Sequence, residues 1–313
     1  MSRSRIYSTA LRYLKNDSSV SFWHTAIAPV FYDYETMSDY YIDLTAKTKY
    51  TGPRDGDGII VLDYFGEIGV QYNPCAVAQL ALGHYARWAR EGEASERKAF
   101  LKLAFWLRNS LEDGRWNYNF NLDAYNRAAP WTSALAQAQG ISVLIRAEIA
   151  CAGQGFAEAS SEACRHMLTP VEGGGLLRVE NGRVFLEEVV SDRLTGILDG
   201  MMFAIFGLQD YVFMFNDREA KMILEKCIDT LEEVLPLYDM GFWSRADLYR
   251  EHPKMIASRF YHGLHVAQLK VMASLSERKT FLDYAEHWED VAKSPVNRAR
   301  AFASKVWFKS WYY

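Results

Sequence analysis

The sequence "GILDGMMFAIFGLQDYVFMF" at residues 196–215 decides the fold, together with "DREAKMILEKCIDTLEEVL" at residues 217–235, which follows it directly. Its most apolar stretch, "GMMFAIFGLQDYVFMF" at residues 200–215, is too short for a membrane span and contains Asp210, so we expect it to form a core helix. In the second segment apolar residues recur at helical spacing, and Asn216, with Glu219 three residues later, predicts its N-terminal cap. A core helix followed at once by an amphipathic helix predicts a helical hairpin.

The same pairing occurs four times along the chain. The first helices of the expected hairpins begin near residues 75, 131, 196 and 258, roughly 55 to 65 residues apart. This repeat predicts a mainly α fold, an α/α toroid of about four helical hairpins, whose between-hairpin loops gather at one end and form the site. We assign residues 1–65 to a small extended or β-rich lead-in that packs on the barrel, and residues 66–313 to the α/α barrel with one inserted β-hairpin.

Composition excludes several classes of protein. A net charge of −4 over 313 residues argues against a nucleic-acid binder. The 19 Tyr, 17 Phe and 9 Trp residues either fill the core or line a cleft for sugar rings. The four cysteines form no CxxC pair, so neither a zinc site nor a disulfide framework is indicated. The N-terminus lacks an apolar signal region, so we expect a cytoplasmic protein without a membrane span.

A β-hairpin is predicted in "RVENGRVFLEEVV" at residues 178–190, because an Asn-Gly pair separates two alternating runs. A two-residue turn places Leu177 opposite Leu186. By alternation Glu188 then falls on the apolar side and Glu187 on the polar side. Apolar surroundings disfavour the charge of a carboxylate and make it a better base. The alternative is that the strand ends at Glu187 and that Glu188 only caps the helix beginning near Thr195.

Five blocks in order give the chain a resemblance to the D-glucuronyl C5-epimerases, over about residues 42 to 290. They are "GVQYNPCAVAQLALGHY", "WTSALAQAQGISVLIRA", "FLEEVVSDRLTGILDGMMFAIFGLQDY", "LPLYD" and "FYHGLHVAQL". Members of that family act on glucuronate units of heparosan-type polysaccharide. They have an α/α-barrel catalytic domain with β-rich additions before it, which agrees with the hairpins counted above.

The resemblance implies an isomerase that epimerises C5 of a uronic acid without a cofactor. The proton next to a carboxylate is removed and another is returned from the opposite face, which requires an acid–base group on each side of the ring. The family's glutamate carries over to Glu188, and its catalytic tyrosine to Tyr261 in "FYHGLH". The hairpin register and the family motif therefore indicate the same glutamate.

The sequence departs from the family pattern at two positions where tyrosines are usual. They are occupied by Val189 and Ala246. The nearby family pattern Asp-Leu-Arg-His is replaced by "DLYR", so that Arg250 supplies a guanidinium one residue later and Tyr249 is a candidate replacement hydroxyl. These changes affect the expected substrate more than the expected fold.

Further substrate-binding candidates come from the charged, aromatic and amide residues of the helix starts and loops. Arg259 and Arg250 suit the two oxygens of a uronate carboxylate, or form surface ion pairs. His262 is a candidate for positioning Tyr261 or the uronate carboxylate. The alternative is that it makes structural hydrogen bonds. Together with His265 it lacks a third ligand, so we expect no metal site. The other candidates are Tyr72, Asn73, Trp116, Trp131, Gln137 and Gln139.

Each of these candidates has a structural alternative. The amides either face the cleft or satisfy backbone groups, and Trp116, Tyr118 and Tyr125 either stack on sugar rings or pack their loop. We therefore expect an epimerase that acts on a uronate-containing polysaccharide or oligosaccharide. A homodimer is the candidate assembly. The rivals are a polysaccharide lyase, which removes the same proton and then eliminates the 4-O substituent, and a catalytically silent carbohydrate-binding homologue.

Overall fold

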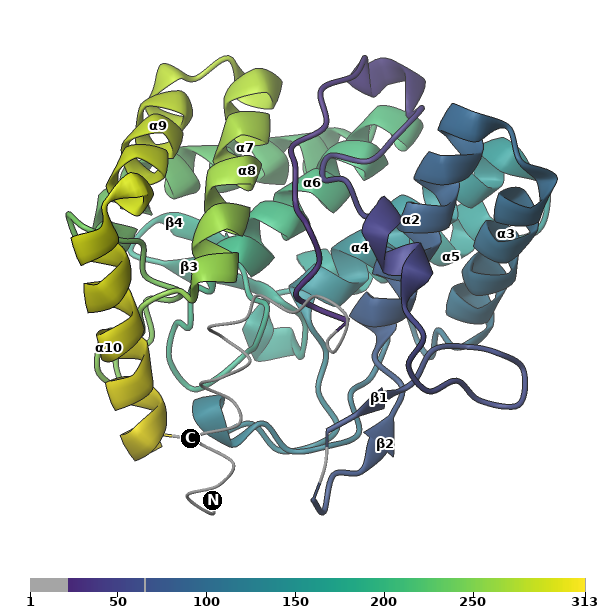
Figure 1. The fold of residues 1–313 in the computed structure, drawn as a ribbon. Helices are drawn as coiled ribbons and strands as arrows, with labels where there is room; N and C mark the ends of the chain where they lie inside the picture. Colours follow the sequence, from purple (N-terminus) through teal and green to yellow (C-terminus); the bar gives the residue numbers. More distant parts are fainter. Residues whose placement is uncertain (1–21, 65, 313) are drawn as a thin grey trace.

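A computed structural model describes residues 22–64 and 66–312 of the chain (Figure 1). The N-terminal stretch for which no signal peptide is expected, residues 1–21, lies outside this part. Within the described residues the protein is mainly α, with nine α-helices and two small antiparallel sheets. The predicted fold class is therefore confirmed.

Eight of the helices form the four predicted hairpins. The hairpins are α2 (Pro74–Glu91) with α3 (Ala94–Asn109), α4 (Ala134–Ala150) with α5 (Phe156–Leu168), α6 (Leu198–Phe215) with α7 (Arg218–Val234), and α8 (Arg259–Ser276) with α9 (Lys279–Lys293). The first helices contact one another in the order α2, α4, α6, α8 and form the inner wall. A last helix, α10 (Pro295–Tyr312), packs on α8 and α9. The segments between hairpins gather at one end of the toroid, the lower end in Figure 1.

Two predicted helix starts need correction. The cap of α7 is Asp217, whose side chain accepts a hydrogen bond from the Ala220 N–H, whereas Asn216 ends α6 in the left-handed conformation with φ of 49°. Asn is one of the few residues that adopt this conformation at low cost, so a one-residue link suffices. The helix expected from Trp131 begins at Ala134, because Trp131 instead pairs with Tyr118 across a β-bridge.

The core helix α6 is wrapped by the other elements on most of its surface. It is the one described helix long and apolar enough to cross a membrane, and 72% of that stretch is buried inside the protein. Its Asp210 is fully buried and forms an ion pair with the equally buried Arg146 of α4, with 2.5 Å between Nη1 and Oδ2. The Tyr41 hydroxyl donates to the other oxygen of Asp210 at 2.7 Å, and Arg146 also donates to the carbonyl oxygen of Asp39.

The lead-in lies between the last inner helix, α8, and the first, α2 (Figure 1). The His24 ring contacts Phe260 of α8 at 5.1 Å, and the Tyr85 hydroxyl of α2 donates to the carbonyl oxygen of Met37. Its described part is extended rather than β-rich, because its aromatic residues pack on helices instead of pairing strands. Its short elements are η1 (Tyr34–Thr36), η2 (Thr45–Lys49) and β1 (Leu62–Asp63), which pairs with β2 (Val70–Gln71).

The inserted hairpin has the predicted register. Strands β3 (Leu177–Glu180) and β4 (Arg183–Leu186) are antiparallel, with Leu177 opposite Leu186. Asn181 and Gly182 both have positive φ, which the tight turn requires. The remaining short helices are η3 (Asp123–Tyr125), η4 (Val171–Gly173) and η5 (Leu235–Tyr238).

The buried ion pair gives a stability prediction. Asp210→Asn leaves the Arg146 guanidinium buried without its anion, so we expect a loss of about 3–5 kcal/mol in the free energy of unfolding. Urea unfolding followed by circular dichroism measures it. The matched control is Glu233→Gln, which breaks the exposed pair between Glu233 and Arg183 and should change stability far less. Equal effects of the two substitutions would contradict the role given to Asp210.

Candidate active site

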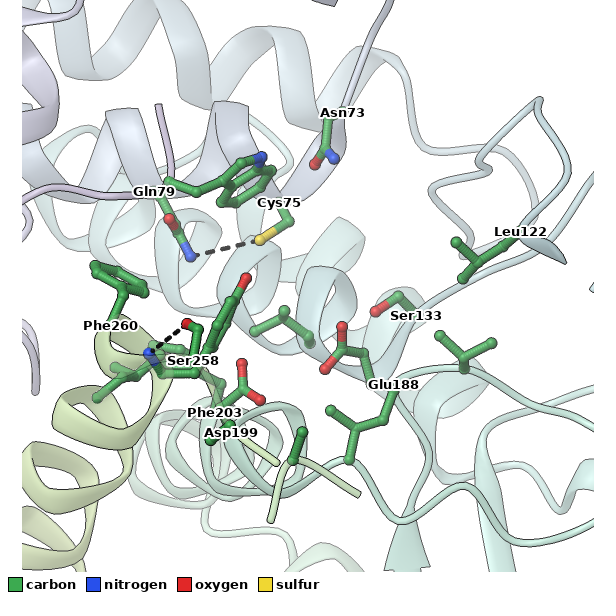
Figure 2. A pocket seen from close by; sticks show the side chains of 18 of the residues that line it. Asn73, Cys75, Gln79, Leu122, Ser133, Glu188, Asp199, Phe203, Ser258 and Phe260 are labelled. Atoms are coloured by element: carbon green, nitrogen blue, oxygen red, sulfur yellow. Dashed lines mark hydrogen bonds between the residues drawn. The ribbon is translucent and has the colours of Figure 1, made fainter. Parts of the chain in front are cut away.

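A cavity of about 400 Å³ opens where the between-hairpin segments meet the inner helices (Figure 2). Most of its wall is apolar or aromatic, a surface suited to the C–H faces of a ring. Its charged side chains are two acids and two lysines, namely Glu188, Asp199, Lys47 and Lys305. The lead-in, the loops and five helices (α2, α4, α6, α8 and α10) all contribute to the wall, so the cavity depends on the complete toroid.

Glu188 lies in this cavity, two residues beyond the end of β4. Its side chain rests against the first turn of α6 at Gly200, where an added Cβ would lie 2.1 Å from Glu188 Oε2 and 2.6 Å from its Cβ. Burial, and secondly the charge of Asp199, raise the pKa of Glu188 well above the usual value. Figure 2 shows both carboxyl groups pointing into the cavity. A carboxylate in this setting is a strengthened base.

The neighbouring Glu187 has a structural role. It is buried and forms an ion pair with Arg178, with 2.7 Å between Oε1 and Nε. It also accepts hydrogen bonds from the Thr195 and Gly196 backbone N–H groups and from the Thr195 hydroxyl. The alternative role for Glu188 is to cap the helix beginning near Thr195. The hydrogen bonds to the Thr195 and Gly196 backbone are instead made by Glu187. The predicted polar side of the hairpin is buried at this point, and the ion pair and these hydrogen bonds offset the cost of burying the carboxylate.

Tyr261 lines the same cavity from the first turn of α8. Ser258 caps this helix by accepting a hydrogen bond from the Tyr261 N–H at 3.2 Å, which fixes the backbone that carries the phenol. The structure therefore brings Glu188 and Tyr261 to one cavity from different elements, the β4–α6 connection and α8.

Two further predicted residues border the cavity. Asn73 caps α2 through Oδ1 and donates from Nδ2 to the Tyr64 hydroxyl at 2.6 Å. Trp131 stacks on Tyr118, with 4.2 Å between ring centroids and 10° between planes. Tyr125 also lines the cavity. Of the expected aromatic platform, Tyr118 and Tyr125 are thus in position.

Four other candidates lie outside the cavity lining. Arg250 and Arg259 are exposed. Tyr72 is 44% exposed and donates to Asp55 Oδ2 at 2.6 Å. Tyr249 borders a separate, smaller cavity of about 220 Å³. Ala246, three residues before Tyr249, lines the main cavity, so the two side chains border different cavities.

The remaining candidates are buried and hold the scaffold together. The Gln137 side chain joins the Trp116 N–H to the carbonyl oxygen of Gly114, and Trp116 Nε1 donates to Leu107. Gln139 accepts from Cys75 Sγ at 3.2 Å. His262 stacks on the indole of Trp243 at 3.9 Å, and burial lowers its pKa to about 4. Gln137, Trp116 and His262 therefore make the scaffold contacts that their structural alternatives predict, whereas Gln139 bonds to a side chain and not to the backbone.

Sequence reasoning missed Asp199 and Lys47. Asp199 was detectable as an acid in the first turn of an otherwise apolar helix. Lys47 lies in a segment without helical or strand periodicity, so no local pattern indicated that it would be buried. Within the part of the chain that the structure describes, no group of three or more His, Cys, Asp or Glu side chains is placed to hold a metal ion.

Comparison with known proteins identifies the family of this chain. Residues 109–290, more than half of the chain, match the family described as the D-glucuronyl C5-epimerase C-terminus. The chain belongs to this family. The matched range of the family contains both Glu188 and Tyr261, whereas Lys47 lies before it.

Two individual relatives are similar at low identity. An uncharacterized protein of Methanocaldococcus jannaschii is 25% identical over 179 residues, which cover 56% of this chain and 57% of that protein. The D-glucuronyl C5-epimerase of Caenorhabditis elegans is 26% identical over 212 residues, which cover 61% of this chain and 34% of that protein. The matches thus span only part of the length of either relative.

The raised pKa of Glu188 gives a stability prediction with a defined sign. A carboxyl whose folded pKa exceeds its ordinary value of 4.5 lowers stability as pH rises from that value through the folded pKa, at about 1.4 kcal/mol for each unit of the difference. Glu188→Gln removes this loss. We expect its stability advantage over wild type to be small near pH 4 and to grow toward neutral pH in urea unfolding. Glu180→Gln, outside the cavity, should not reproduce this dependence.

The contact at Gly200 gives a second prediction. Gly200→Ala displaces Glu188 toward water, so the Glu188 pKa should fall toward 4.5 in a ¹³C NMR titration of its carboxyl carbon. Gly263→Ala on α8 is the matched control, because an added Cβ there meets no atom within 4 Å. A Glu188 titration unchanged by Gly200→Ala would show that the carboxyl does not rest on α6.

Proposed function

We propose that this protein epimerises C5 of uronate residues, of the heparosan type, in a polysaccharide or oligosaccharide. The observation that carries the proposal is that Glu188 and Tyr261 line one ring-sized cavity from different elements. Family membership supports the same reaction class. The aromatic wall, with Trp131 and Tyr118 stacked at its edge, suits a sugar ring.

The reaction follows from the two groups in simple steps. Ionised Glu188 takes the C5 proton, and the electron pair of the C–H bond passes into the adjacent carboxylate. Tyr261 gives its phenolic proton to the opposite face of C5, which inverts the carbon. Glu188 is then protonated and Tyr261 ionised, and proton exchange with solvent restores both. Burial strengthens Glu188 as the base, and its loss of charge in this step relieves the repulsion from Asp199.

The departures from the family pattern lie in the cavity wall. Val189 and Ala246 both line it, so the apolar side chains enlarge the cavity and present no hydroxyl there. Three other tyrosines of the lead-in and loops, Tyr64, Tyr118 and Tyr125, line the cavity, with the Tyr118 hydroxyl donating to Asn73 and the Tyr125 hydroxyl to Asp247. The tyrosines of this cavity therefore differ in position from those of the family pattern. This difference keeps elimination as a second candidate reaction, because the placement of hydrogen-bond donors influences whether the intermediate regains a proton at C5 or loses its 4-O substituent.

Incubation with uronate polymers in heavy water, followed by NMR at C5, tests the proposal. Wild type should incorporate deuterium at C5, and Glu188→Gln and Tyr261→Phe should each slow incorporation about 100-fold or more, the usual contribution of a positioned acid or base. Glu180→Gln and Tyr284→Phe, which remove the same groups outside the cavity, should remain active.

Other outcomes would replace the proposal. An unsaturated product absorbing in the ultraviolet identifies a lyase. Saccharide binding without exchange in wild type identifies a binding protein. A Glu188→Gln variant as active as wild type removes the assigned base.

A further inference from the structure

The cavity contains a buried positive charge that has no anionic partner in the part of the chain that the structure describes. Lys47 of η2 is only 3% exposed, and its Nζ donates to the carbonyl oxygen of Phe22 at 2.9 Å. The ammonium lies over the Phe22 ring, 4.3 Å from its centroid, and 5.6 Å from that of Trp23. Among the described residues no acidic side chain lies within ion-pair distance of Lys47. An ammonium has three donors, so this site has capacity for another acceptor.

The fold holds this lysine in place despite the cost of burying it. Burial lowers the Lys47 pKa to about 8, because removal from water disfavours the charged form. Helix α2 approaches η2 closely at Gly83, where an added Cβ would lie 2.5 Å from the carbonyl oxygen of Leu44. A large side chain at residue 83 would therefore lift η2 and Lys47 from the barrel. A buried cation kept by such close packing fits a site whose anion arrives with a ligand.

The distribution of charge in the cavity identifies where a ligand carboxylate belongs. The acids in the lining, Glu188 and Asp199, would repel it. The cations in the lining are Lys47 and Lys305, and Lys305 reaches the cavity from α10, where its Nζ donates to the carbonyl oxygen of Ile256 at 2.9 Å. Lys47 is the more deeply buried of the two. The arginines predicted for this role are exposed, outside the lining.

We infer that Lys47 binds the carboxylate of the uronate substrate and stabilises the charge that develops there when C5 loses its proton. The inference rests on the proposed function and assigns its substrate-recognition residue. Removal of the C5 proton places a second negative charge on the carboxylate oxygens, and a cation in a water-poor cavity stabilises that charge more than it stabilises the ground state. The lead-in therefore contributes a substrate-binding residue in addition to packing on the barrel.

The test compares a uronate oligosaccharide with the same oligosaccharide whose carboxylates are reduced to primary alcohols. Isothermal titration calorimetry should show that wild type prefers the uronate, and that Lys47→Met loses this preference, with uronate affinity falling 10-fold or more and affinity for the reduced ligand nearly unchanged. Deuterium incorporation at C5 should fall about 100-fold. Lys49→Met, which removes the same charge from an exposed position on η2, should behave as wild type.

The pH dependence of binding is an independent readout. Uronate affinity of wild type should decline as pH rises above about 8, because free Lys47 then loses its proton, and the decline should be absent in Lys47→Met. Lys47→Gln keeps a donor for the Phe22 carbonyl without the charge, so it separates loss of charge from misfolding of η2. Thermal unfolding of each variant checks that the fold is kept.

The outcomes separate this inference from the proposed reaction. If Lys47→Met and Lys47→Gln retain the preference for the uronate, the inference is overturned, and C5 exchange by wild type still supports the reaction. If wild type shows a Lys47-dependent preference without exchange, the carboxylate site stands and the epimerase reaction fails. If wild type has no preference between the two ligands, the carboxylate site is refuted.

Discussion

The buried pair of Arg146 and Asp210 is the constraint on which the toroid depends. It joins the inner helices α4 and α6. Through the Asp39 carbonyl and the Tyr41 hydroxyl it also joins both helices to the lead-in. Two charges removed from water at such depth are tolerated only when nearly every donor and acceptor is satisfied. The pair therefore couples three elements, because separating any of them leaves a buried charge or a buried hydrogen-bonding group without its partner.

Much of the fold could be predicted because its signals are local. Helical periodicity located the four hairpins, and the Asn-Gly turn fixed the register of β3 and β4. The errors have local causes as well. Asn216 suits both an N-terminal cap and a left-handed helix C-terminus. In the structure it ends α6, and Asp217 caps α7. Trp131 has a helix-like neighbourhood, but its partner Tyr118 lies across a loop, and this pairing is invisible to a sequence window.

The candidate site was predictable only in part. Glu188 and Tyr261 reached one cavity, as the hairpin register and the family motif indicated. Arg250, Arg259, Tyr72 and Tyr249 did not, because a charge or a hydroxyl in a loop carries no information about the direction in which it points. Lys47 was missed for the opposite reason. Lysine is usually exposed, and its burial here comes from tertiary packing between η2 and α2.

The seam between α8 and α2 bears on how this chain must fold as it is synthesised. The ring of His24 contacts that of Phe260, so two groups that touch lie 236 positions apart (260 minus 24) in a chain of 313 residues. Synthesis must therefore reach α8 before this seam can close and the cavity can be complete. Such a long loop closure favours slow folding. Partly synthesised chains that still lack α8 therefore have an incomplete cavity, because α8 supplies part of its wall.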